Sequence, residues 1–390
     1  MGTLTVRRLP AVLLTALLVF GCSNAVSASV AMTPPAPTTT PTSPVAAASP
    51  AAGTSTPATT VTPTLAHLIG QKLVVRMDGT TPSASLLGRI HRGEIGGIIL
   101  FGFNITTRQA LIALTARLQA AARAGGQPPL LIAVDQEGGS IKRIPWAPPT
   151  LSVPRMGQLD STTIARDQGA ATGSALRGLG INVDFAPVAD VPATTASFMY
   201  REGRTWSFSA VHTAALSNAF ATGLESKGVI PSMKHFPGLG FATRNTDSSV
   251  VTIRMSTSRL APGLRPYRTA IARHIPLIML SNATYTAYDS THAAGWSRVI
   301  TQTLLRHDLG FSGVTITDSL NGTAAARGLS SRTLAVRAAI AGTDMLLLTG
   351  SEASSAAVFA TLLTDARNGT IPRTRLTASY GRIRAMKAGL

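Results

Sequence analysis

The feature that most constrains the fold is a repeated alternation of short apolar segments with longer helix-like segments. The longer segments include residues 107–124, 210–227, 301–308 and 354–366. Short strands separated by helices, and apolar on both faces, are typical of a parallel sheet that is covered on both sides. The short segments with this character are residues 73–75, 97–101, 130–134, 183–186, 230–233, 277–280, 314–317 and 345–348.

Eight such units in residues 64–390 predict a (β/α)₈ barrel of the TIM type, folded as a single globular domain. An open, doubly wound sheet is the alternative. That fold often carries a Gly-x-Gly-x-x-Gly pattern after its first strand, and here Gly238-Leu239-Gly240 is only a fragment of such a pattern. The barrel is therefore the favoured prediction.

The N-terminus has the features of an export signal. Arg7 and Arg8 precede an apolar run over residues 13–20, which is shorter than the roughly 20 residues that span a bilayer. This pattern predicts a signal peptide over residues 1–21. Cys22, the single cysteine of the chain, directly follows Gly21 and resembles the lipidated cysteine of a bacterial lipobox.

We therefore expect cleavage before Cys22, lipidation of its thiol, and an exported protein anchored in the cell membrane close to the wall. An ordinary secretory signal with an incidental thiol is the alternative. Residues 22–63 are mostly Ala, Thr, Pro and Ser without charge, a composition that buries too little apolar surface to fold. They predict a disordered spacer between the membrane and the barrel.

The net charge of +18 favours contact with anionic surfaces, such as acidic wall polymers or phospholipid headgroups. The basic residues are dispersed and form no run interleaved with aromatic residues, so nucleic-acid binding is not expected. The sequence lacks the cysteine pairs and the His-x-x-x-His spacing that would indicate a metal enzyme. It also lacks the Gly-x-Ser-x-Gly element that would indicate a serine hydrolase.

Polar residues follow three of the predicted strands directly. They are Asp135, the pair Lys234 and His235, and Asp318. In a barrel of this type the carboxyl ends of all strands meet at one face, and that face carries the active site. The four side chains are therefore expected to lie close together.

Three motifs in the same region of the chain carry a family resemblance. They are VDQEGG at residues 134–139, KHFPGLG at residues 234–240, and LRHDLGFSGV with TDSL at residues 305–320. GGIILF at residues 96–101 and AGTDM at residues 341–345 are weaker. Together they resemble glycoside hydrolase family 3, and the single-domain bacterial β-N-acetylhexosaminidase branch is the nearest match.

The resemblance implies that Asp318 is a nucleophile, which forms a glycosyl-enzyme that water later hydrolyses with net retention. The alternative for Asp318 is a helix N-cap. The resemblance also implies substrate-binding roles for Asp135, Arg143, Arg204, Lys234 and His235. A buried salt-bridge network among Asp135, Lys234 and Arg204 is the structural alternative, and both roles are compatible. Glu137 fits backbone support and substrate contact equally well.

The sequence departs from this branch at its general acid/base. The branch carries an Asp-Ser-His element whose histidine does this work, whereas here the residues are Asp247-Ser248-Ser249. A serine hydroxyl does not exchange protons near neutral pH, and loss of a general acid costs about 10²–10⁴ in rate. Leu239 and Ser140 also differ from the branch, which has His and usually Arg there.

Three interpretations remain open. Asp247, or less favourably Glu202, replaces the histidine; the protein turns over only substrates with good leaving groups; or it binds sugars without cleaving them. Among the other histidines, His292 alone lies on a loop that could reach the catalytic face.

We therefore predict a retaining β-N-acetylhexosaminidase that removes β-linked N-acetylglucosamine from wall-derived glycans, with Asp318 and Asp247 as catalytic residues. The alternatives are a non-catalytic sugar-binding lipoprotein and a β-glucosidase with changed specificity. Retention of the nucleophile motif favours an enzyme. The resemblance implies a monomer without metal or cofactor.

Overall fold

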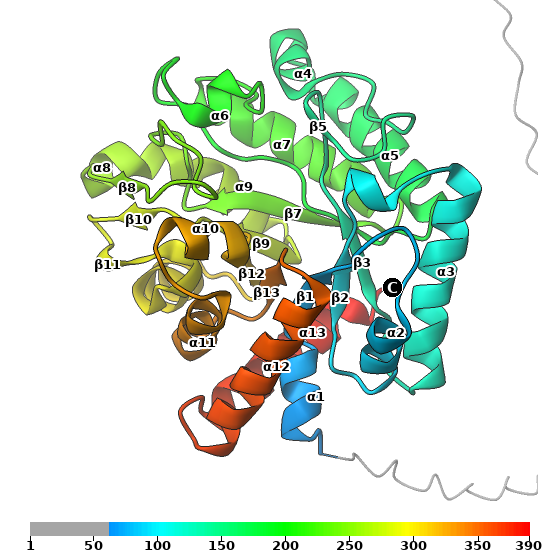
Figure 1. Ribbon diagram of the computed structural model, residues 1–390. Helices are drawn as coiled ribbons and strands as arrows, with labels where there is room; N and C mark the ends of the chain where they lie inside the picture. Colours follow the sequence, from blue (N-terminus) through cyan, green and yellow to red (C-terminus); the bar gives the residue numbers. More distant parts are fainter. Residues whose placement is uncertain (1–61) are drawn as a thin grey trace, which may run out of the picture. The chain divides into compact units, whose positions relative to one another are not determined.

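The computed structural model describes residues 62–390, which form a ring of parallel strands surrounded by helices (Figure 1). The predicted signal peptide, Cys22 and all but the end of the predicted spacer lie outside the described residues. The ring runs in the order β12-β9-β7-β6-β3-β2-β1-β13. Its strands are β1 (Leu73–Arg76), β2 (Gly97–Ile99), β3 (Leu131–Val134), β6 (Val183–Asp184), β7 (Ile230–Phe236), β9 (Leu277–Leu280), β12 (Val314–Thr317) and β13 (Leu346–Leu348).

The first and last strands of this order meet and close the ring. Ile316 and Met345 form a parallel bridge between them. The amide of Met345 donates to the carbonyl of Thr315 at 2.8 Å, and the amide of Thr317 donates to the carbonyl of Met345 at 3.1 Å. The predicted (β/α)₈ barrel is confirmed.

Each strand buries both of its faces, which explains why the eight segments are apolar throughout. Val74, Ile99 and Leu131 belong to the cluster that fills the barrel. Their neighbours Val75 and Ile98 belong to the cluster between the strands and the helices. Because successive side chains of a strand point to opposite faces, a barrel strand covered by helices needs apolar residues at consecutive positions.

Several predicted strands differ from the structure in their bounds, and the difference at β7 affects the site. Lys234 and His235 do not follow a strand but belong to β7, which extends to Phe236. The extension forms because β7 continues to pair with β9 beyond a register shift, with Phe236 opposite Leu280. Both polar residues still lie near the carboxyl end of the strand.

The helices surround the ring in the order expected for such a barrel (Figure 1). They are α1 (Leu65–Gly70), α2 (Ala84–His91), α3 (Arg108–Ala124), α4 (Val153–Leu159), α5 (Thr162–Gly178), α6 (Phe198–Arg201), α7 (Ala210–Glu225), α8 (Thr257–Leu260), α9 (Arg265–Ala272), α10 (Leu320–Ala326), α11 (Ser331–Ala341), α12 (Glu352–Arg367) and α13 (Arg373–Lys387), with 3₁₀-helices η1 (Gly102–Asn104), η2 (Ala261–Leu264) and η3 (Ala294–Trp296) and the π-helix η4 (Val299–Asp308).

Short hydroxyl side chains set the start of the helices that the sequence predicted. Thr107 caps α3, Ser209 caps α7 and Ser351 caps α12, each through a side-chain oxygen that accepts a backbone N–H of the first turn. The fourth predicted helix, at residues 301–308, is the π-helix η4. Within residues 62–390, no helix combines the length and the apolar character needed to cross a bilayer.

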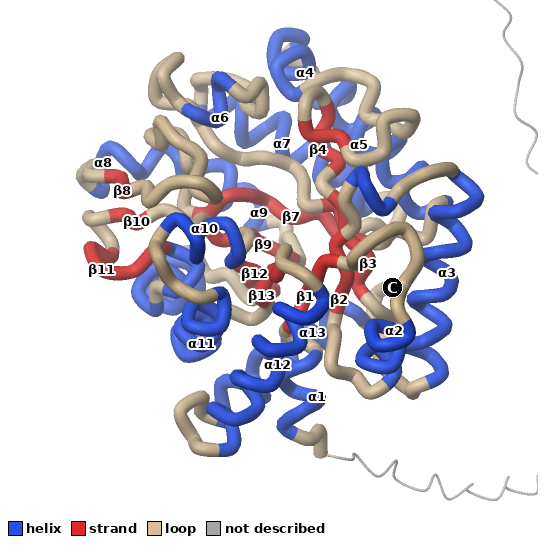
Figure 2. The backbone as a smooth tube through the Cα atoms, viewed as in Figure 1, coloured by secondary structure: helices blue, strands red, loops and turns tan. Residues whose placement is uncertain are grey.

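Two small sheets lie outside the barrel (Figure 2). Their strands have two to five residues, too few for a recognisable alternation of apolar and polar positions. One sheet is a hairpin of β4 (Gln136–Gly138) and β5 (Ile141–Lys142), and the other joins β8 (Thr252–Ile253), β10 (Thr284–Tyr285) and β11 (Asp289–Ala293).

A buried carboxylate stabilises the junction between β12 and β13, where the barrel closes. Asp344 is fully buried just before β13, where it accepts hydrogen bonds from Arg382 at 2.7 Å, from the amide of Thr315 at 2.9 Å, and from Arg306. Burial alone would raise the pKa of Asp344, but the charges of Arg306 and Arg382 hold it below the ordinary carboxyl value. The carboxylate is therefore ionised throughout the neutral range.

Replacement of this carboxylate tests its contribution. Asp344→Ala leaves two arginine side chains without their partner, so the free energy of unfolding in urea should fall by about 3–5 kcal/mol. Asp308→Ala removes an exposed Asp–His pair and should change it by less than about 0.5 kcal/mol. The contribution of Asp344 should be complete above the ordinary carboxyl pKa and disappear as the pH falls through its lowered value. Equal effects of the two variants would contradict this role.

Candidate active site

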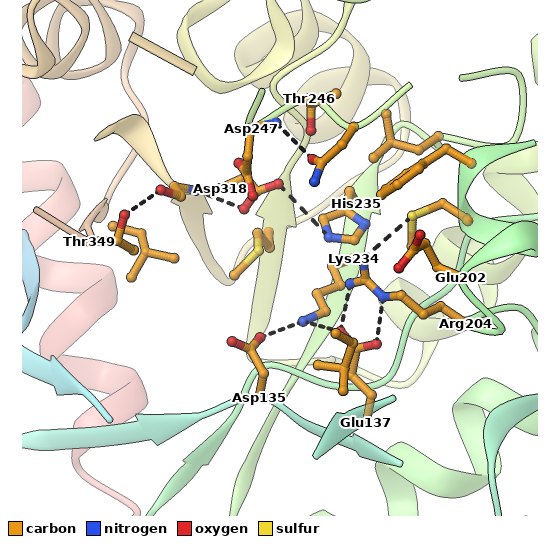
Figure 3. A pocket seen from close by; sticks show the side chains of 18 of the residues that line it. Asp135, Glu137, Glu202, Arg204, Lys234, His235, Thr246, Asp247, Asp318 and Thr349 are labelled. Carbon is orange, nitrogen blue, oxygen red and sulfur yellow. Dashed lines mark hydrogen bonds and ion pairs between the residues drawn. The ribbon is translucent and has the colours of Figure 1, made fainter. Parts of the chain in front are cut away.

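A cavity of about 310 Å³ opens at the carboxyl ends of the strands (Figure 3). Ile99, Met279 and Leu347, which belong to the barrel interior, form part of its lining. The rest of the lining comes from the end of β7, from residues that directly follow β3 and β12, from the hairpin of β4 and β5, from α6 and from loops. All of the predicted catalytic and binding residues line it, namely Asp135, Arg143, Arg204, Lys234, His235, Asp247 and Asp318.

Lys234 lies between two carboxylates on the wall of the cavity (Figure 3). Its Nζ atom is 2.7 Å from Asp135 Oδ1 and 2.7 Å from Glu137 Oε1. Glu137 in turn accepts two hydrogen bonds from Arg204, at 2.7 and 2.8 Å. The network expected among Asp135, Lys234 and Arg204 therefore exists, but Glu137 connects Arg204 to it.

The buried charges of this network stabilise one another. Burial alone would raise the pKa of Glu137, but the charges of Arg204 and Lys234 and their hydrogen bonds lower it to about 2. Burial likewise opposes the charge of Lys234, but Asp135 and Glu137 raise its pKa above the ordinary lysine value. The cations are therefore charged and fixed in position before any ligand arrives.

The hairpin of β4 and β5 brings Arg143 beside Asp135. Its turn contains Gly138 and Gly139, whose φ angles of 100° and 64° are positive and strongly favour glycine. Arg143 Nη2 then lies 3.7 Å from Asp135 Oδ2, and the guanidinium lies 5.5 Å from the ring centroid of Phe101. Asp135 accepts and Arg143 donates hydrogen bonds, so the pair can bind neighbouring hydroxyl groups.

His235 is oriented by a buried aspartate that the sequence prediction missed. Asp190 accepts hydrogen bonds from His235 Nδ1 at 2.8 Å and from the amide of Leu239 at 2.7 Å. Because Nδ1 donates to this carboxylate, Nε2 faces the cavity and lies 3.9 Å from Asp318 Oδ2. The only signal in the sequence was a carboxylate four residues beyond the predicted strand at residues 183–186.

Asp318 directly follows β12, and its backbone amide donates to the carbonyl of Leu280 at 2.9 Å. The alternative reading as a helix N-cap was wrong, because Ser319 holds the N-cap position of α10. Asp318 Oδ1 instead accepts from the amide of Ser319 at 2.7 Å. This contact orients the carboxylate and leaves Oδ2 on the side of His235.

Asp247 lies on the loop after β7, near Asp318 (Figure 3). Much of the residue is exposed, but its carboxyl group faces the cavity. Partial desolvation of this group and the negative charge of Asp318 raise the pKa of Asp247 to about 7. A carboxyl group with this pKa holds a proton near neutral pH and releases it readily, as a general acid/base requires.

A glycine allows this loop to approach the segment after β12. Gly322 lies in the first turn of α10, and a Cβ atom on it would be 2.8 Å from the backbone oxygen of Asp247. Real Cβ atoms do not come so close to a backbone oxygen. The absence of a side chain at Gly322 therefore sets how near Asp247 lies to Asp318.

The other candidate residues differ in position. Glu202 lines the cavity, but Ser249 does not. His292 is about half exposed, bonds to Asp289 at 3.1 Å and lies outside the cavity, so the hypothesis that it reaches the site was wrong. Over residues 62–390, no group of three or more His, Cys, Asp or Glu side chains is arranged to hold a metal ion.

Comparisons with known proteins identify the family to which this barrel belongs. Residues 64–386 match the glycosyl hydrolase family 3 N-terminal domain. A protein described as an uncharacterized secreted glycosyl hydrolase from Arthroderma benhamiae is 33% identical over 336 residues, which cover 84% of this chain and 94% of that protein. A β-hexosaminidase from Nitrosomonas eutropha is 32% identical over 289 residues, which cover 71% of this chain and 80% of that protein.

A solved structure shows the same architecture. The β-N-acetylhexosaminidase from Beutenbergia cavernae superposes with a TM-score of 0.77 at 30% identity, covering 84% of this chain and 99% of that one. Some relatives are longer, since the chain spans 49% of a further β-hexosaminidase and 63% of a further solved chain. With the family domain matched over nearly the whole barrel, the chain belongs to glycosyl hydrolase family 3 and is a glycosidase.

Proposed function

We propose that the protein is a retaining β-N-acetylhexosaminidase that releases β-linked N-acetylglucosamine from wall-derived glycans. The observation that carries the proposal is the pair of carboxyl groups, Asp318 and Asp247, at one cavity beside a fixed set of cations. The similarity to the β-hexosaminidase of Nitrosomonas eutropha and to the β-N-acetylhexosaminidase of Beutenbergia cavernae supports the choice of sugar.

In the first step Asp318 Oδ2 attacks the anomeric carbon while the bond to the leaving oxygen breaks. Asp247 donates its proton to that oxygen, so the leaving group departs as a neutral alcohol. The pKa of about 7 means that a large fraction of Asp247 is protonated at neutral pH. The histidine that the family resemblance led us to expect is therefore not needed for this step.

In the second step Asp247 acts as a base. Once Asp318 is esterified to the sugar, it no longer carries the negative charge that raised the pKa of Asp247. The carboxylate of Asp247 can then take a proton from water, which attacks the anomeric carbon and frees Asp318. The same carboxyl group thus serves as acid and as base because the charge of its neighbour changes between steps.

The network around Lys234 binds the sugar. Asp135 and Arg143 can pair with adjacent hydroxyl groups, and Lys234, Arg204 and His235 donate further hydrogen bonds. Their partners Glu137 and Asp190 hold these donors in place, so little side-chain entropy is lost when the substrate binds. The raised pKa of Asp247 favours this enzyme over a sugar-binding protein without activity.

We also propose that the barrel is exported and anchored through a lipid on Cys22. The description of the relative from Arthroderma benhamiae as secreted supports export. Metabolic labelling with an alkyne fatty acid in a bacterial host should mark the full-length protein, and Cys22→Ala should lose the label. A labelled Cys22→Ala protein would contradict this anchor.

The nucleophile is tested by Asp318→Ala. Hydrolysis of an aryl β-N-acetylglucosaminide should fall by about 10⁴-fold or more, because no covalent intermediate can form. A 2-deoxy-2-fluoro glycosyl donor with an activated leaving group should add one sugar mass to the unmodified protein, mapping to Asp318. Asp308→Ala, which changes an exposed carboxylate, is the control. If the donor binds without forming an adduct, the protein is a sugar-binding module.

The acid/base is tested by Asp247→Asn. For substrates with poor leaving groups, kcat/KM should fall by about 10²–10⁴, whereas cleavage of a dinitrophenyl glycoside needs little protonation and should be nearly unchanged in its first step. In the proposed mechanism activity requires protonated Asp247, so kcat/KM of the unmodified protein should decline above about pH 7. The Asp247→Asn protein should not show this decline. Ser249→Ala should match the unmodified protein. Equal losses on both kinds of substrate would rule out Asp247 as the acid.

A further inference from the structure

The exposed aromatic side chains of the described residues lie on connections that leave the catalytic face. Among the large apolar side chains that are exposed in residues 62–390, the aromatic ones are Phe103, Trp146, Tyr200 and Phe208. Phe103 follows β2, Trp146 follows the hairpin after β3, and the other two follow β6. All three connections leave the carboxyl ends of barrel strands. Exposed aromatic residues gathered at one face are typical of a binding surface.

Two of these residues form a pair on the segment that supports the loop of Asp247. The rings of Tyr200 and Phe208 have centroids 4.9 Å apart. The same segment contacts the loop directly, since the amide of Phe198 donates to the carbonyl of Ala242 at 2.7 Å. Arg201 donates to the carbonyl of Thr243 at 2.6 Å. The aromatic pair is therefore attached to the acid side of the catalytic cavity.

Beside this pair lies a second depression of about 320 Å³, which we call the outer hollow. It shares a wall with the catalytic cavity, because Leu239 lines the cavity whereas Gly238 and Gly240 line the hollow. The guanidinium of Arg259 lies 5.7 Å from the ring centroid of Phe241 within it. Phe208, Phe241 and Arg259 are lining residues whose side chains can contact a ligand there.

The chemistry of the site determines which part of a substrate faces this hollow. A general acid delivers its proton to the glycosidic oxygen, so the leaving group lies on the side of Asp247. The other aromatic pair, Phe101 and Phe103, lies instead beside Arg143, on the side that binds the hydroxyl groups of the cleaved sugar. The outer hollow adjoins the loop that carries Asp247, the side toward which the leaving group extends in the proposed mechanism.

We infer that the outer hollow binds a pyranose ring of the leaving-group chain, beyond the unit next to the cleaved bond. This inference rests on the proposed function of Asp247. A pyranose has apolar C–H faces that pack on rings such as Phe208 and Phe241, and a rim of hydroxyl groups that accept from Arg259. The protein is therefore selective for oligosaccharides over disaccharides.

Kinetics with β-linked N-acetylglucosamine oligomers test the inference. For the unmodified protein, kcat/KM should rise from the disaccharide to the hexasaccharide. Phe208→Ala should lower kcat/KM for the hexasaccharide by about threefold to tenfold, the factor that one aromatic contact supplies, and leave the aryl glycoside unchanged. Phe103→Ala is the matched control: Phe103 is 54% exposed and Phe208 is 48% exposed, but Phe103 stacks on Phe101 beside Arg143 and does not line the outer hollow. Its ratio of hexasaccharide to disaccharide activity should match that of the unmodified protein.

The opposite outcomes are distinct. If Phe208→Ala lowers the rates on all substrates equally, its effect is structural and the inference is wrong. If the aryl glycoside is not hydrolysed at all, the proposed function fails, but calorimetry with the Asp318→Ala protein still tests the hollow. There the hexasaccharide should bind more tightly than the disaccharide, and Phe208→Ala should remove the difference. Equal binding, or Phe208-dependent binding of phospholipid vesicles instead of sugar, would overturn the inference.

Discussion

The catalytic face depends on the ammonium group of Lys234, held between the carboxylates of Asp135 and Glu137. Asp135 directly follows β3 and Lys234 belongs to β7, so the contact ties two strands across β6, which lies between them. A buried ion pair of this kind adds little net stability, because desolvation offsets most of the attraction. What it supplies is geometry: through Glu137 it also fixes Arg204, and the donors therefore keep their positions when the cavity is empty.

The second constraint is that the carboxyl groups of Asp247 and Asp318 lie close together. The mechanism we propose requires the first to be protonated while the second is ionised. Desolvation raises the pKa of Asp247 to about 7, and the nearby negative charge of Asp318 adds to this effect. Enzymes commonly separate an acid from a base in this way, by giving two similar groups different environments. In the mechanism we propose, Asp247 takes the role of the histidine that the family resemblance places two residues later in the sequence.

Much of the fold could be predicted from the sequence because barrel strands are apolar on both faces and read as short continuous runs. The predicted site residues also line one cavity, since strand ends converge in a barrel. The sequence could not show Asp190 or the linking role of Glu137, because partners of buried charges are defined by tertiary contacts rather than by spacing. Similarly, β4, β5, β8 and β10 are too short to produce a recognisable pattern.

Gly322 gives the active site an unusual dependence on a residue that has no side chain. Any larger residue at this position would push the backbone of Asp247 away from α10 and so away from Asp318. The repulsion between the two carboxyl groups would weaken with distance, and Asp247 would become a stronger acid. In the mechanism we propose, the small volume of Gly322 thus helps to set the pH above which activity declines, although glycine has no side chain that titrates.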